Sequence, residues 1–132
     1  MQFDHIGIFV SNLEQGRSRF RELLNIVSIS EEFYDPLLKV AVQFLIDSSG
    51  IRYEIIAPNG PGNPVEPILT DKRNILNHIA YRADDFDACI ERLRKVHYMP
   101  LGRPQQAVAF QGRRVVFLLS PLRMIIEIIE TV

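Results

Sequence analysis

Cysteine is nearly absent from the sequence, with only Cys89 among 132 residues. One cysteine cannot form a disulfide within the chain, and low cysteine use is typical of reducing compartments such as the cytoplasm. The first residues, MQFDHIGIFV, have no basic stretch ahead of their apolar run, so they do not resemble a secretory signal. We therefore expect a cytoplasmic protein without an internal disulfide.

Long apolar runs and an excess of positive charge are also missing. No apolar run approaches the roughly 18 residues that would indicate a membrane span. The 15 basic and 16 acidic side chains leave a net charge of −1, so the chain has no surplus of cations to bind phosphates. We expect no membrane and no nucleic-acid partner.

The remaining composition is that of an ordinary globular protein. Hydrophobic residues make up 47% of the chain and charged residues 23%, which supplies enough apolar material for a core. A length of 132 residues lies in the range that single domains commonly have. We expect one domain over residues 1–132.

An internal repeat organises this domain. The segments DHIGIFVSNLEQGRSRF and NHIAYRADDFDACIERL align without a gap at an offset of 73 residues, which superimposes His5 on His78. The same offset superimposes Glu54 on Glu127 much further along the chain. We predict two homologous modules, about 1–58 and 75–132, joined by a linker at 59–74 that is rich in Pro, Gly and Asn.

Each predicted module contains a strand, a helix and then further strands. The first strand alternates in hydrophobicity, and Ser11 with Glu14 has the S-x-x-E spacing of a capping box where the first helix begins. Asp84 or Asp85 can cap the second helix. The pattern is βαβββ twice, which predicts an α+β fold with helices on one face of a sheet. The other face is then free to curve around a ligand.

Four polar residues share that second face by strand alternation: His5, Glu54, His78 and Glu127. One histidine on a strand is more often structural than a ligand, and one glutamate among isoleucines often marks a solvated edge. The repeat of both at one offset favours function, because a part-buried carboxylate needs a partner or a metal. Two imidazoles and two carboxylates suit Zn²⁺, Co²⁺, Ni²⁺, Fe²⁺ or Mn²⁺, with room left for substrate.

Several segments resemble those of one family. FDHIGIFVSNLEQGRSRFRELL, IRYEIIAP, ILNHIAYRADDFDACIERLRK and GRRVVFLLSP resemble the vicinal oxygen chelate (glyoxalase/bleomycin resistance/dioxygenase) superfamily, and are most similar to methylmalonyl-CoA epimerase-like proteins. The resemblance implies that paired βαβββ modules form a curved mixed sheet that cups one divalent metal ion: Co, Zn, Ni or Mn. It also implies that His5, Glu54, His78 and Glu127 hold the ion, and that the protein is a homodimer.

The resemblance further implies an isomerase, epimerase or lyase that works through an enolate of an acyl thioester or an α-oxo compound. A metal ion on the carbonyl oxygen takes up developing charge, and a base removes the neighbouring proton. Glu127 or Glu54 is the catalytic candidate for one face of the substrate. The second proton-handling group stays open among Glu31, Glu32, Gln43 and Asp47.

Two alternatives belong to the same fold. Glyoxalase I has glutamate at the position of Glu54 whereas epimerases often have glutamine, so a lactoylglutathione lyase is the second enzyme hypothesis. A metal-free protein that binds a small molecule, such as a drug, is the non-enzymatic hypothesis, although such a protein has no need of the intact His and Glu set. The segment SPLRMII lacks the glycine-containing turn of relatives, which indicates a different acyl or sugar-linked substrate.

Overall fold

The computed structural model describes residues 1–70 and 76–131, and the chain divides into two compact units. The first unit is His5–Asn77, and the second is Met1–Asp4 together with His78–Val132. Helix α2 (Val65–Thr70) lies within the linker predicted at 59–74. The end of that linker, 71–74, and residue 75 of the second predicted module lie outside the described residues.

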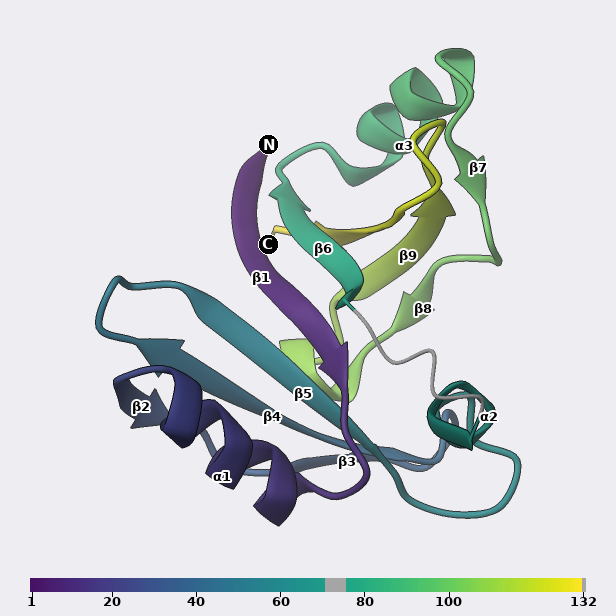
Figure 1. Cartoon of the computed structure of the whole chain (residues 1–132). Helices are drawn as coiled ribbons and strands as arrows, with labels where there is room; N and C mark the ends of the chain where they lie inside the picture. Colours follow the sequence, from purple (N-terminus) through teal and green to yellow (C-terminus); the bar gives the residue numbers. More distant parts are fainter. Residues whose placement is uncertain (71–75, 132) are drawn as a thin grey trace. The chain divides into compact units, whose positions relative to one another are not determined.

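The first unit contains one sheet and helix α1. The strand order is β2–β4–β5–β1; β1 runs parallel to β5, and β3 pairs with β4 beside β2. Figure 1 shows α1 lying across one face of β4 and β5. The bounds are β1 (Gln2–Phe9, of which Gln2–Asp4 belongs to the second unit), α1 (Leu13–Leu23), β2 (Ile26–Ile29), β3 (Phe33–Asp35), β4 (Val40–Asp47) and β5 (Arg52–Pro58).

Helix α1 begins one residue later than the predicted capping box requires. The cap is Asn12, whose side-chain oxygen accepts a hydrogen bond from the Gln15 backbone N–H at 2.7 Å, while the Ser11 hydroxyl contacts the Gln15 side chain. The Ser11–Glu14 box is therefore wrong, because the adjacent asparagine satisfies the free N–H groups of the first turn. Leu13 is buried from this helix against Leu45 and Ile55 of the sheet.

The second unit repeats this arrangement. Its strand order is β6–β10–β9–β7, with β6 parallel to β10 and β8 paired with β9. Helix α3 packs on β10, and its cap is Asp85, which accepts from the Ala88 N–H at 3.1 Å. The bounds are β6 (Leu76–Ala83, of which Leu76 and Asn77 belong to the first unit), α3 (Phe86–Lys95), β7 (Met99–Pro100), β8 (Gln105–Gln106), the 3₁₀ turn η1 (Val108–Phe110), β9 (Arg114–Leu119) and β10 (Ile125–Glu130).

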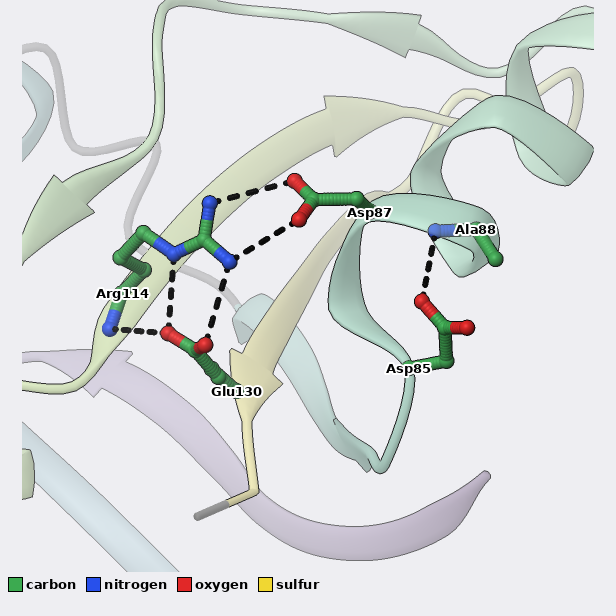
Figure 2. A network of polar contacts seen from close by, with 5 residues as sticks. All are labelled: Asp85, Asp87, Ala88, Arg114 and Glu130. Carbon is green, nitrogen blue, oxygen red and sulfur yellow. Dashed lines mark hydrogen bonds and ion pairs between the residues drawn. The ribbon is translucent and has the colours of Figure 1, made fainter.

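A charged network fastens α3 to this sheet. Figure 2 shows the Arg114 guanidinium of β9 donating two hydrogen bonds to Asp87 of α3 and two more to Glu130 of β10. The hydrogen bonds from Arg114 hold the pKa of Glu130 below its ordinary value, against the effect of partial burial. The same guanidinium lies 4.6 Å from the centre of the Phe86 ring, so it also covers the first turn of the helix.

The α+β class and the repeated strand–helix–strand order are confirmed. Two short strands, β3 and β8, were not predicted, because segments of three and two residues show no alternation of their own and exist only by pairing with β4 and β9. Among the described residues, no helix is both long enough and apolar enough to cross a membrane.

Candidate functional site

The first unit carries a buried histidine–glutamate pair on the sheet face opposite α1. Ile55 of β5 packs under the helix, so Glu54 points to the other face. In the register of β1 with β5, Gly7 lies opposite Glu54, which places His5 on the same face. His5 is fully buried and Glu54 is 6% exposed. The His5 Nε2 and Glu54 Oε1 atoms are 3.4 Å apart.

The second unit carries a matching pair. Ile126 and Ile128 of β10 pack under α3, so Glu127 points to the opposite face. His78 of β6 lies opposite Ile125 and shares that face. His78 is 2% exposed and Glu127 is 3% exposed. The distance from His78 Nε2 to Glu127 Oε1 is again 3.4 Å.

The geometry within each pair fits a metal ion. A distance of 3.4 Å exceeds the range of a good N–H···O hydrogen bond. Two ligand atoms that lie about 2.1 Å from one ion are separated by roughly 3.0 Å at a right angle and roughly 3.4 Å at the tetrahedral angle. Imidazole nitrogens with carboxylate oxygens suit zinc, cobalt, nickel, iron and manganese. These four buried side chains are therefore a donor set that could hold a divalent metal ion.

An aromatic ring accompanies each pair and was not among the predicted site residues. Phe44 of β4 lies opposite Glu54 and packs perpendicular to the His5 ring, and Phe117 of β9 lies opposite Glu127 and packs perpendicular to the His78 ring. The signal was present, because Phe44 and Phe117 are also 73 residues apart. Apolar residues in a strand are normally interpreted as core, so the repeat of phenylalanine was overlooked.

Two candidates for the second proton-handling group face the helix instead. The Gln43 side chain accepts a hydrogen bond from Arg17 of α1 at 2.8 Å and donates one to the Ser30 carbonyl. Asp47 accepts from the Ser49 and Ile51 backbone N–H groups and the Tyr53 hydroxyl. Although burial raises the pKa of Asp47, these hydrogen bonds outweigh it and hold that pKa below its ordinary value. Asp47 is thus a turn cap.

Glu31 and Glu32, the other two candidates for the second proton-handling group, differ in their side-chain contacts. Glu32 accepts a hydrogen bond from the Tyr34 hydroxyl at 3.1 Å and lies 3.7 Å from Arg17. For Glu31, the described part of the chain shows no side-chain hydrogen bond or ion pair, and the residue is exposed. Glu31 lies two positions before Phe33, which pairs with Val42 on the same face of the sheet as Phe44. Of the four candidates, Glu31 is the one whose carboxylate is not engaged elsewhere.

Comparison with known proteins places this geometry in a family. The chain is 26% identical over 118 residues to an ethylmalonyl-CoA/methylmalonyl-CoA epimerase of Cereibacter sphaeroides, covering 89% of this chain and 87% of that relative. It is 27% identical over 118 residues to YqjC of Bacillus subtilis, a protein of uncharacterised function, covering 89% of this chain and 81% of YqjC.

Solved structures show the same fold. The crystal structure of methylmalonyl-CoA epimerase from Mycobacterium tuberculosis matches with a TM-score of 0.81 at 20% identity, covering 99% of this chain and 88% of that one. The family model of the Glyoxalase/Bleomycin resistance protein/Dioxygenase superfamily matches residues 4–117, which include three of the four candidate ligands. The resemblance inferred from the sequence is confirmed, and the chain belongs to the Glyoxalase/Bleomycin resistance protein/Dioxygenase superfamily.

Proposed function

We propose that His5, Glu54, His78 and Glu127 together hold one divalent metal ion, and that the protein is an epimerase-type enzyme acting on an acyl thioester. The observation that carries the proposal is the repetition of one buried His–Glu pair, with the same distance, in both units. The similarity to an ethylmalonyl-CoA/methylmalonyl-CoA epimerase supports the acyl thioester as substrate class.

Burial argues that the pairs are built for binding. Glutamate is rarely buried unless it is paired or bound to a metal, because removing a carboxylate from water is unfavourable. Glu54 and Glu127 are both nearly inaccessible, and each faces a histidine nitrogen. A metal bound by all four side chains would compensate both carboxylates and, as a Lewis acid, would make the proton beside a thioester carbonyl easier to remove.

The chain itself must supply the proton transfers. Epimerisation removes a proton from one face of a carbon and returns one to the opposite face, so two groups are needed. We assign one role to Glu127 or Glu54, and the other to the Glu31 carboxylate, which is exposed and not engaged elsewhere. Phe33 and Phe44 pack edge to face at 6.2 Å on the sheet face that carries Glu54, and they give that face an apolar surface.

A second candidate function is a glyoxalase I-type lyase. The observation that favours it is the carboxylate of Glu54, because the resemblance implies glutamate at that position in glyoxalase I and frequently glutamine in epimerases. Both reactions begin with removal of a proton beside a carbonyl, so the same buried donor set serves either.

The test is deuterium exchange. Metal-loaded protein is incubated in deuterated buffer with acyl-CoA thioesters that carry an α-proton, such as methylmalonyl-CoA and ethylmalonyl-CoA, and incorporation is followed by mass spectrometry. We expect exchange for both epimers, and we expect the Glu31→Gln variant to reduce it by at least about 100-fold for the epimer whose proton Glu31 removes, while Glu14→Gln, an exposed carboxylate on α1, leaves it unchanged.

The other outcomes separate the hypotheses. Absence of exchange on every thioester, with conversion of a glutathione hemithioacetal instead, would favour the lyase. Absence of both reactions in a metal-loaded protein would contradict enzymatic function and leave the small-molecule binding protein as the better account.

A further inference from the structure

The His–Glu repeat has a third member in each unit. Phe44 lies directly opposite Glu54 in the β4·β5 register, and Phe117 lies directly opposite Glu127 in the β9·β10 register. The His5 and Phe44 ring centres are 5.5 Å apart with an angle of 75° between the ring planes. The His78 and Phe117 ring centres are 5.3 Å apart at 79°.

This agreement covers three side chains in each unit. Each unit combines one imidazole, one phenyl ring and one carboxylate in the same relative positions, although some of the surrounding residues differ. Arg52, for example, places its guanidinium 3.9 Å from the centre of the Phe44 ring, whereas the residue 73 positions later is Ile125. The phenyl ring is kept although this neighbour on the same sheet face is not, and in both units it packs edge to face against the histidine ring.

A histidine on a strand has one torsion that leaves its ring plane poorly defined. The terminal torsion of imidazole has a broad, nearly two-fold energy profile, so packing must select the orientation that directs Nε2 toward a bound ion. A perpendicular phenyl ring favours one plane, because aromatic pairs prefer edge-to-face or offset packing over face-to-face stacking. The glutamate lies on the Nε2 side of each histidine at 3.4 Å, so the phenyl ring and the carboxylate together define the ring plane.

We propose that Phe44 and Phe117 are positioning residues that fix the imidazole planes of His5 and His78 for metal binding. A phenyl ring has no atom that ligates a divalent metal ion, so each acts through the histidine that it contacts. The metal-binding part of this inference rests on the proposed function, whereas the fixing of the rings does not, since it acts in the metal-free protein as well.

The test uses three leucine variants of the full chain. Phe44→Leu and Phe117→Leu remove one ring each and keep most of the apolar volume. Phe20→Leu is the matched control, because Phe20 packs against Tyr53 at 5.2 Å between α1 and the helix face of the sheet. Thermal unfolding of all three establishes that each folds and how much stability each loses.

Two readouts follow for each variant. The affinity for Co²⁺ is measured by competition with a chromophoric chelator, together with the visible absorption bands of the bound ion. The order of each histidine ring is measured in the metal-free protein by ¹³C relaxation of its C–H groups. A role limited to packing would lower the unfolding temperature without changing either quantity.

We expect Phe44→Leu and Phe117→Leu each to weaken Co²⁺ binding by roughly tenfold, as loss of a group that orients a metal ligand does, and to alter the absorption bands. Ring order falls for His5 only in Phe44→Leu and for His78 only in Phe117→Leu, and Phe20→Leu matches the wild type. Unchanged ring order in both variants would overturn the inference. If the wild type takes up no Co²⁺ but the ring order falls as described, the proposed function fails and the positioning role stands.

Discussion

The two units share a set of histidine, glutamate and phenylalanine on one face of their sheets, and they differ at several positions on the face that the helix covers. On the face that carries His5 and Glu54, or His78 and Glu127, the histidine, the glutamate, the register and the His–Glu distance repeat. On the helix face some apolar residues repeat, such as Leu45 and Leu118, and other positions differ. Arg17 of α1 bonds to Gln43 in the first unit, whereas at the equivalent positions of the second unit Ile90 of α3 packs against the apolar cluster that contains Val116.

This difference reflects the different requirements of helix packing and of metal binding. A helix can be held to a sheet by a polar pair or by an apolar pair, provided that the buried groups satisfy each other. A metal site cannot exchange its donors so freely, because the ion accepts only certain atoms at certain distances. Repetition of the histidine and the glutamate, beside the exchange of a polar pair for an apolar pair under the helix, therefore supports a ligand-binding role for the repeated side chains.

The largest effect on stability is expected where the two helix faces remain equivalent. Leu45 and Leu118 are 73 residues apart, both are fully buried, and each packs under its own helix. We expect Leu45→Ala and Leu118→Ala to lower the free energy of unfolding by about 3 kcal/mol each. Urea denaturation measures this, with the exposed Leu37→Ala as control, for which a change below about 0.5 kcal/mol is expected. A loss confined to one unit would contradict the equivalence.

A smaller effect is expected where the helix faces differ. Gln43→Val gives the first unit the residue type of Val116 and removes the acceptor for Arg17, so we expect a loss of about 1–2 kcal/mol. The double variant Arg17→Ile/Gln43→Val recreates the apolar pair of the second unit and should recover most of that loss. A double-mutant cycle from chemical denaturation measures the coupling. Additive losses would show that the two side chains are not a unit.

The smallest effect concerns a charge pair that only the second unit has. Arg114 and Glu130 correspond to Ala41 and Ala57 in the first unit. Because Arg114 lowers the pKa of Glu130, the pair stabilises the fold above the unfolded pKa of glutamate, near about 4.3, and loses its contribution as the pH falls through the lower folded value.

The Glu130→Gln variant tests this pH dependence. Its unfolding temperature should lie below that of the wild type above about pH 5 and approach it toward about pH 3. Glu91→Gln, an exposed change on α3 outside the described ion pairs, is the control and should show no such convergence. A constant difference between wild type and Glu130→Gln at every pH would contradict an electrostatic origin.

The face on which each candidate residue lies was predictable from the sequence. Strand alternation and the 73-residue offset together placed His5, Glu54, His78 and Glu127 opposite the helices, and the register of each unit agrees. Successive side chains of a strand alternate between the two faces of the sheet. Once one apolar neighbour is known to face the helix, the face of each candidate residue is therefore determined. Their role as ligands stays a prediction, because donor type and spacing do not measure affinity.

Other features required the structure. The cap of α1 was misassigned because serine and asparagine stand next to each other, and only the path of the chain out of β1 decides which one caps. Gln43 looked like a candidate acid–base residue because a polar side chain in an apolar strand is conspicuous. Its partner Arg17 lies 26 residues away on another element, which no local pattern reveals.

The most direct test of the central claim is the number of metal ions per chain. Protein purified without chelator, and the same protein reloaded with Co²⁺, Ni²⁺ or Zn²⁺, is analysed by elemental mass spectrometry beside His5→Ala, His78→Ala and the surface control His97→Ala. If the two pairs serve one site, the wild type and His97→Ala hold about one ion per chain, and either of the other histidine variants loses it. An absence of metal in the wild type, or retention of the ion by His5→Ala or His78→Ala, would contradict a single four-residue site.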